Sequence, residues 1–381
     1  MLATPRRRSA GLPFAANGVL YGTWAARIPE IQEQAGLGEA ELGLALLGAA
    51  VGLIVSASAT GALAERFGAR RLTLAALVLF GAAVVAPGLA VGLWSLAAGL
   101  ALVGLTSGLM DVAMNAWAAE VEAAEEATIL GACHGLFSLG AMVGAGLGAL
   151  AAWAALPLAL HFAASGVVFA GGAVVQGWGV DDLPASDEAE VQEDAPLFAL
   201  PGGAMTGLAG LAFCGLIVEG GIADWSAVFA RDALGASPAT APLGFAAFSA
   251  CMAAARFGSD GVADRLGGRR LVGLGAGVAV VGLALCVAAS HVAVATLGFG
   301  IAGLGLAGVV PSLFRAASRA GGSRAIAAVT SVGYVGFLAG PPALGFVAEA
   351  VGLRASFGLL VALAAIVALG AAGAFARAER G

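Results

Sequence analysis

Twelve continuous apolar segments, each long enough to cross a lipid bilayer, make up most of this sequence. A bilayer-spanning helix takes about 20 mainly apolar residues. The segments are rich in Ala, Leu, Val and Gly and do not alternate apolar with polar residues, which argues against an outer-membrane barrel. Only 11% of the residues are charged, too few to cover a water-facing surface. The sequence therefore predicts an all-α membrane protein whose twelve transmembrane helices cover residues 11–32, 40–64, 72–92, 94–118, 128–153, 155–176, 202–230, 240–259, 271–290, 292–316, 325–348 and 353–376.

One long hydrophilic stretch interrupts this pattern. Residues 177–201 hold seven of the acids and separate six apolar segments from the next six. Such a charged, apolar-poor stretch is typical of a linker. We therefore expect an N-terminal six-helix bundle at 1–176, an acidic cytoplasmic linker at 177–201 and a C-terminal six-helix bundle at 202–381.

The arginines indicate the orientation. With the N-terminus in the cytoplasm, fourteen arginines fall in cytoplasmic segments and three on the opposite face. Cytoplasmic loops carry an excess of basic residues, and an even number of spans brings both ends to one side. The sequence thus predicts a multi-pass protein of the bacterial inner membrane with cytoplasmic N- and C-termini.

An internal repeat relates the two halves. Residues 61–72 return in similar form at 260–271, an offset of 199 residues, and Gly104 recurs as Gly303 at the same offset. Internal repeats of this kind build many transporters. The offset predicts two equivalent halves.

The repeated stretch has the form G/D-x-x-x-[D/E]-R-x-G-x-R-R in the turns after spans two and eight, and it resembles the signature of the major facilitator superfamily. The resemblance covers the whole chain and implies two pseudo-symmetric six-helix bundles, the major facilitator fold, facing each other across a central cavity that opens alternately to either side. A carboxylate at a helix end can bridge to a neighbouring helix or arginine. Glu65 and Asp264, followed by Arg66 and Arg265, are therefore candidate latches for the cytoplasmic side; the alternative is that the arginines only anchor the chain.

Ionisable side chains inside spans are costly and so are functional candidates. Asp111 lies in the fourth span with Asn115 one helical turn later, and His134 lies at similar depth in the fifth span. A buried carboxyl beside an imidazole can take up or release a proton, so we expect Asp111 and His134 to couple transport to protons. The alternative is a structural hydrogen bond between the two spans. The repeat positions are Val310 and Gly333, so the fold itself requires no polar group there.

Residues 104–148 also resemble the fucose:proton symporter branch and neighbouring uncharacterised bacterial inner-membrane transporters. In that branch an acid in span four is followed four residues later by Asn, and span five begins with a polar residue before Phe-x-x-Gly, here His134 and Phe137 to Gly140. The resemblance implies that Asp111 is a coupling carboxylate. The first-helix aspartate of those symporters has no counterpart, because no acid precedes Glu30.

Two further acids lie in the seventh span. Glu219, beside two glycines, is a candidate for substrate binding or a second protonation site, or else a structural acid paired across helices. Asp224 and Arg27 lie towards the periplasmic ends of spans seven and one, where a gating ion pair could form. The alternative is a local pair of Arg27 with Glu30.

Aromatic side chains and a proline complete the candidates. The expected cavity aromatics, any of which could instead serve packing, are Tyr21, Trp24, Trp225, Tyr334 and Phe337. Pro341, followed by a second proline, should bend span eleven and act as a gate hinge.

Together these features predict a secondary active transporter that moves a small polar solute, a sugar or similar metabolite, by proton-coupled alternating access. Proton-driven efflux of drugs or metabolites is the main alternative, and a transport-dead sensor that signals through the linker is a third. Nucleophile–base pairs, clustered metal ligands and phosphate-binding loops are absent from the sequence, so we expect no enzyme, cofactor, metal or nucleic-acid partner. The expected partners are the lipid bilayer, protons and the solute, and the expected state is a monomer.

Overall fold

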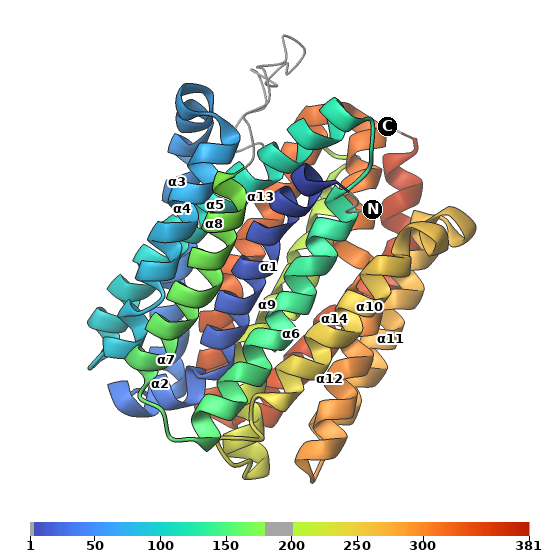
Figure 1. Cartoon of the computed structure of the whole chain (residues 1–381). Coiled ribbons are helices and arrows are strands. Elements are labelled where there is room, and N and C mark those ends of the chain that lie inside the picture. Colours follow the sequence, from blue (N-terminus) through green and yellow to red (C-terminus); the bar gives the residue numbers. More distant parts are fainter. Residues whose placement is uncertain (1–3, 180–200, 381) are drawn as a thin grey trace.

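The computed structural model describes residues 4–179 and 201–380, except for the side chains of residues 57–59, 258–264 and 323. The described part is all-helical (Figure 1). The short elements η1 (Ala86–Leu89) and η2 (Gly166–Ala170) continue α4 and α7. The α-helices are α1 (Pro5–Ala26), α2 (Ile28–Ala35), α3 (Glu39–Phe67), α4 (Ala69–Ala83), α5 (Leu93–Glu125), α6 (Leu130–Trp153), α7 (Leu158–Ser165), α8 (Gly171–Trp178), α9 (Thr206–Leu234), α10 (Leu243–Leu266), α11 (Gly268–Ala288), α12 (Val292–Leu306), α13 (Val309–Val351) and α14 (Leu353–Ala378).

Ten described segments are long and apolar enough to cross a membrane. The other two expected spans correspond to α1 and to α10, whose apolar part is the shorter stretch Leu243–Phe257. Both helices carry polar side chains that face an internal cavity, Asn17 on α1 and Arg256 on α10, and this lowers their apolar character. Span ten comprises α12 and the first part of α13, and span eleven is the rest of α13 after non-helical backbone at Gly321 and Gly322.

The end of the first span differs from the prediction. We expected one apolar segment up to residue 32, but α1 ends at Ala26 and the separate short helix α2 begins at Ile28. Pro29 lies in the first turn of α2, where its missing N–H and fixed φ favour a new helix start. The polar end of the expected span therefore turns away from the axis of α1.

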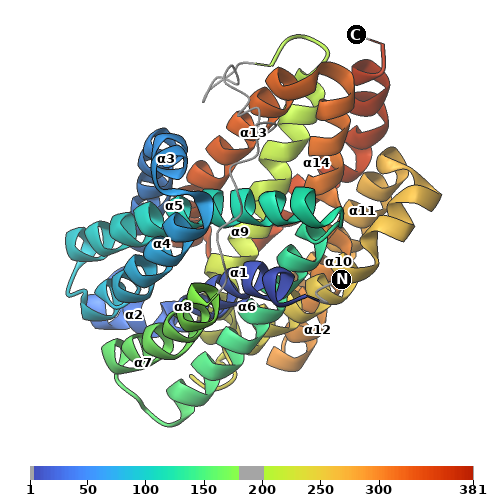
Figure 2. The same ribbon diagram turned by 45° about the horizontal axis from the view of Figure 1, so that its top comes forward.

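The helices form two bundles, one from α1 to α8 and one from α9 to α14, seen side by side in Figures 1 and 2. The bundles meet mainly where α6 packs on α10 and where α3 packs on α13. Because successive spans run in opposite directions, the starts of α1, α4 and α11 and the ends of α3, α10 and α14 share one end of the molecule. We call this the arginine-rich end, at the top of Figure 1, and the other the opposite end.

Glycines bring the helices of each bundle into backbone contact. A Cβ atom added to Gly104 of α5 would overlap the carbonyl oxygen of Ala49 on α3. A Cβ atom on Gly303 of α12 would overlap the carbonyl oxygen of Phe248 on α10. Both members of the second pair lie 199 residues after those of the first, so the same small-residue contact recurs in both halves.

The repeated signature loops also share their backbone shape. Gly68 and Gly267, again 199 residues apart, have φ of +81° and +74° and directly precede α4 and α11. Only glycine adopts this left-handed region without strain. The signature glycine is thus required by the turn between two antiparallel spans.

Candidate functional site

A cavity of about 420 Å³ lies between the two bundles and is lined by residues of both. Its walls are largely apolar, with polar side chains from α1, α5, α6, α9 and α10. Half of the candidate residues named from the sequence line it, although they come from distant segments. Those that line it are Tyr21, Trp24, Asp111, His134, Glu219, Asp224, Phe337 and Pro341.

Asp111 is positioned on α5 by its own helix. Asn115, one turn later, donates from Nδ2 to the backbone oxygen of Asp111 at 2.8 Å and lies 3.4 Å from its carboxylate Oδ1. Among the described residues no cation forms an ion pair with this carboxylate. Asn115 does not line the cavity, because its amide is turned back toward the preceding turn of α5. Asp111 thus presents an acid without a charged partner to the cavity.

His134 shares the cavity with Asp111 but does not hydrogen-bond to it in the described structure. The imidazole is exposed and packs edge-on against Phe14 of α1, with ring centroids 5.3 Å apart. The structural hydrogen bond between spans four and five is therefore not present.

Glu219 is paired across helices. Its Oε1 lies 3.2 Å from Nη2 of Arg256 on α10, and Nη1 of the same arginine donates to Oγ of Ser138 on α6 at 2.8 Å. Less than a quarter of either charged side chain is exposed, 23% for Glu219 and 18% for Arg256. Because Ser138 belongs to the first bundle, Arg256 links the two bundles beside the cavity.

The pairing of Arg256 with Glu219 and Ser138 was not predicted from the sequence. A signal was present, because arginine inside a span is rare and the position 199 residues earlier is Ala57. The fold therefore does not require a cation at this place. The partners of Arg256 could not be derived from the sequence, because no regular spacing connects them to it.

Arg27 and Asp224 do not pair with each other. Arg27 Nε lies 2.9 Å from Oε1 of Glu30, and its other nitrogens donate to Nδ1 of His161 at 3.4 Å and to the backbone oxygen of Leu156 at 3.1 Å. The local alternative is thus the one that the structure shows, and His161 also contacts Arg27. Asp224 is 7% exposed, lines the cavity and forms no ion pair among the described residues.

Burial of Glu30 raises the pKa of its carboxyl, and the Arg27 guanidinium opposes this rise. Glu30 lies on α2, outside the membrane-spanning segments.

Contacts between the bundles close the opposite end. Arg231 at the end of α9 donates to Oε1 of Gln32 at 2.7 Å and to the backbone oxygen of Pro29. Oε2 of Glu349 accepts from the backbone N–H of Ala40 at 2.9 Å. These residues were not among the predicted gating residues, because nothing in their local sequence marks a partner in the other half.

The predicted latch is not formed by the first signature loop. Glu65 is exposed and makes no hydrogen bond or ion pair with described residues, while Arg66 lies over the ring of Phe67, 5.2 Å from its centroid. Arg265 is exposed, and the side chain of Asp264 lies outside the described part of the chain. The disengaged Glu65 agrees with a molecule that is held together at its opposite end.

The aromatic predictions divide. Tyr21 lies between the bundles, with ring centroids 6.1 Å from both Phe137 and Phe245. Trp225 is fully buried and does not line the cavity, because consecutive residues lie about 100° apart on a helix and Asp224 takes the cavity side. Tyr334 is 47% exposed and also does not line the cavity, whereas Phe337 one turn later does.

Pro341 lines the cavity without breaking its helix. The only non-helical backbone within the described α13 is at Gly321 and Gly322. The backbone at Pro341 instead approaches Gly43 of α3 so closely that a Cβ atom there would lie 2.7 Å from the carbonyl oxygen of Pro341. The proline therefore marks a crossing between the bundles.

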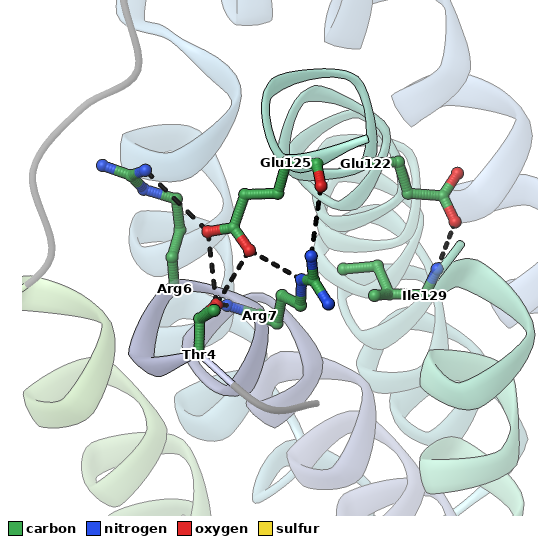
Figure 3. Close-up of polar contacts among 6 residues, drawn as sticks. All are labelled: Thr4, Arg6, Arg7, Glu122, Glu125 and Ile129. Atoms are coloured by element: carbon green, nitrogen blue, oxygen red, sulfur yellow. Dashed lines mark hydrogen bonds and ion pairs between the residues drawn. The ribbon is translucent and has the colours of Figure 1, made fainter. Parts of the chain in front are cut away.

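A polar cluster fixes the arginine-rich end of the first bundle (Figure 3). Arg7 Nε lies 2.6 Å from Oε2 of Glu125 at the end of α5, and Oγ1 of Thr4 donates to the same oxygen at 2.9 Å. Glu122 accepts from the backbone N–H groups of Ile129 and Leu130, where the start of α6 leaves donors unpaired. The cluster ties α1, α5 and α6 together at this end.

Comparisons with known proteins agree with this architecture. The family model described as Major Facilitator Superfamily matches residues 14–318. An uncharacterised MFS-type transporter of Yersinia pestis is 32% identical over 372 residues, covering 95% of this chain and 94% of the relative. An uncharacterised transporter of Sinorhizobium fredii is 32% identical over 373 residues, covering 96% and 98%. The crystal structure of a D-xylose-proton symporter matches with a TM-score of 0.74 at 15% identity over 97% of each chain, a likeness of fold.

Proposed function

This chain belongs to the major facilitator superfamily of secondary transporters, and we propose that it moves a small polar solute, a sugar or similar metabolite, across the bacterial inner membrane with protons as the coupling ion. Asp111 is the coupling acid in this proposal, and His134 is its partner. Glu219, Tyr21, Trp24 and Phe337 contact the solute.

The observation that carries the proposal is the Asp111 carboxyl, which lines the cavity between the bundles and has no ion-pair partner in the described structure. An ionised side chain at the centre of a span costs about 2.5–3.5 kcal/mol on insertion scales. Closing the cavity around this carboxylate therefore favours proton uptake, and opening it to water favours release. A solute that closes the cavity only when the acid is protonated would be carried with a proton.

Two contacts support alternating access. Arg231 and Glu349 hold the bundles together at the opposite end, while the Glu65 latch at the arginine-rich end is disengaged. Rocking would exchange the two sets of contacts. With the arginine-rich end in the cytoplasm, as the positive-inside rule favours, this is the inward-facing state, and residues 177–201 form a cytoplasmic linker, most of which lies outside the described residues.

The test is flux in proteoliposomes with an imposed pH gradient, using radiolabelled monosaccharides and sugar alcohols as probes. We expect a pH gradient to drive uptake in the intact protein and Asp111→Asn to abolish the gradient dependence. Glu33→Gln, which neutralises an exposed acid outside the cavity, should behave as the intact protein. Equal gradient-driven flux in the intact protein and Asp111→Asn would contradict the coupling assignment.

Proton-driven efflux is the second candidate, because the cavity walls are largely apolar, with Leu20, Leu53, Val103 and Met114 among them. The same vesicles distinguish the two functions when a fluorescent lipophilic cation replaces the sugars: export of the dye against its gradient favours efflux. The sensor alternative predicts that deleting residues 187–194 of the linker abolishes function, whereas a transporter should retain its flux.

A further inference from the structure

A second pocket, of about 870 Å³, lies at the arginine-rich end of the second bundle and is separate from the central cavity. It is enclosed by the start of α11, the part of α13 before its break, and the end of α14. Four of its lining residues are arginines, Arg269, Arg270, Arg315 and Arg319, and one is an acid, Glu379. Among the described lining residues cations therefore outnumber anions by four to one.

The arginines are exposed side chains, so the pocket is open to a ligand. Guanidinium groups donate to phosphate oxygens in a planar, often bidentate geometry. The charge distribution therefore fits an anionic ligand.

A second observation comes from α13. Ser312 lines this pocket, is 3% exposed, and its Oγ has no hydrogen-bond partner among the described residues. Buried hydroxyl groups are nearly always hydrogen-bonded. An unpartnered hydroxyl in the wall of an arginine-lined pocket indicates that a ligand completes the site.

The start of α11 adds oriented donors. The helix begins at Gly268 with no side-chain cap and no acid in its first turn. The first N–H groups of a helix have no intrahelical partner and carry the positive end of its dipole. Gly268 and the two arginines after it lie on the pocket wall, so these donors reinforce the arginines.

The repeat shows that the fold does not require this arrangement. The positions equivalent to Ser312, Arg315 and Arg319 in the first half are Ala113, Ala116 and Glu120. Arg70, the equivalent of Arg269, donates to the backbone oxygen of Gly177 at 2.9 Å and so contributes to the fold of its own bundle. The cations in the first part of α13 are thus additions to the second half.

Apolar side chains continue from the pocket along the outer face of the bundle. Leu274 and Val278, one and two turns after Arg270 on α11, are 61% and 42% exposed, and Leu369 on α14 is 85% exposed. A ligand with a phosphate at one end and hydrocarbon chains at the other would satisfy both surfaces. Basic pockets between spans on the cytoplasmic side are typical sites for anionic lipid head groups.

We propose that the pocket formed by Arg269, Arg270, Arg315, Arg319 and Ser312 binds the phosphate of an anionic phospholipid, whose acyl chains lie along α11 and α14. This site is independent of the solute cavity and of the coupling assignment. The lipid joins α11, α13 and α14 and stabilises the second bundle where the described protein contacts leave Ser312 unpaired.

The test uses the purified full-length chain in detergent and measures thermal unfolding and lipid binding by native mass spectrometry. The probes are phosphatidylglycerol, phosphatidylcholine and inorganic phosphate. We expect phosphatidylglycerol to bind and to raise the unfolding temperature, and the two other probes to have little effect. Phosphatidylcholine carries a phosphate but no net charge, so it separates charge recognition from general lipid binding.

The variants probe the arginines of α13. Arg315→Ala with Arg319→Gln should weaken phosphatidylglycerol binding roughly 30-fold, from two basic contacts near a lipid surface. Arg319→Gln alone, at an exposed position, should weaken it about fivefold and keeps the test available if the double variant does not fold. Arg377→Gln with Arg380→Gln removes the same charge from the same end outside the pocket and should leave binding unchanged.

Two results would overturn the proposal. One is equal phosphatidylglycerol binding by the intact chain and both α13 variants. The other is inorganic phosphate that binds as tightly as the lipid and displaces it, which would identify a soluble phosphate compound as the ligand. Because no solute or pH gradient is used, failure of the transport proposal does not affect this measurement.

Discussion

The link from Glu219 through Arg256 to Ser138 crosses the interface between the bundles. It should contribute measurably to the free energy of unfolding of the protein in the arrangement described here. Arg256→Gln would leave the Glu219 carboxylate beside the cavity without its cation and remove the 2.8 Å hydrogen bond to Ser138. A hydrogen bond to a charged group contributes about 1.5–3 kcal/mol. Because both charged side chains are roughly one fifth exposed, water screens part of this interaction.

We therefore expect a coupling energy between Glu219 and Arg256 of about 1–2 kcal/mol, below the value for a fully buried pair. The measurement is a double-mutant cycle with Arg256→Gln, Glu219→Gln and the double variant, followed by thermal unfolding of purified protein. Arg256→Gln alone should destabilise most, since it leaves an unpaired carboxylate. The double variant should recover part of the loss.

Arg8→Gln supplies the matched control, because Arg8 is exposed and its side chain forms no hydrogen bond or ion pair with the described residues. Its unfolding free energy should change by less than about 0.5 kcal/mol. Losses in the two single variants that simply add in the double variant would refute the ion pair. The hydrogen bond to Ser138 has its own readout, since Ser138→Ala should change the spin-label distance between α6 and α10 without creating an unpaired charge.

Three further predictions follow from single contacts. Gly104→Val should destabilise the first bundle by about 1–3 kcal/mol or more, because the added atoms overlap the α3 backbone. Gly146→Ala, with open space around it, should not lower the unfolding temperature. Equal unfolding temperatures of Gly104→Val and the intact protein would contradict the packing. Arg231→Gln should shift molecules toward opening at the opposite end, by about fivefold for a lost contact of about 1 kcal/mol, and spin labels at residues 33 and 237 should then report longer distances; an unchanged distance distribution would count against the gate. Burial raises the pKa of Glu30 above its ordinary value of 4.5, so its contribution to stability is greatest below pH 4.5 and falls as the pH rises towards neutral. The difference in unfolding temperature between the intact protein and Glu30→Gln should therefore decrease with rising pH. An increase of this difference with rising pH would contradict the prediction.

The sequence predicted the scaffold well because the scaffold depends on local and periodic features. Bilayer thickness sets the length of every apolar segment, and the 199-residue offset located equivalent turns and packing glycines such as Gly68 and Gly267. The inserted helix α2 was missed because an apolar stretch does not reveal a change of direction.

The candidate site was predictable in its members but not in its contacts. Rarity of charge inside spans is a property of single residues, and it identified Asp111, Glu219 and Asp224, all of which line the cavity. Pairing is a property of two distant helices, so the partner of Glu219 and the partners of Arg27 could not be derived from spacing. Arg256 lies 37 residues from Glu219 and 118 from Ser138, and no periodic pattern connects such positions.

The repeat offers a physical criterion that separates scaffold from function. Positions that keep their residue after 199 steps, such as Gly104 and Gly303, form backbone contacts that each bundle needs separately. Positions that carry different residues in the two halves are not needed for these backbone contacts. Asp111 and Arg256, whose equivalents are Val310 and Ala57, are such positions, and both line the shared cavity. Arg231 and Gln32 are also equivalent positions that carry different residues, and here the two residues hydrogen-bond to each other. A contact between equivalent residues of two pseudo-symmetric halves must lie close to the pseudo-twofold axis that relates the halves. The Arg231–Gln32 hydrogen bond therefore lies at the centre of the opposite end, and a rocking motion that opens this end has to break it.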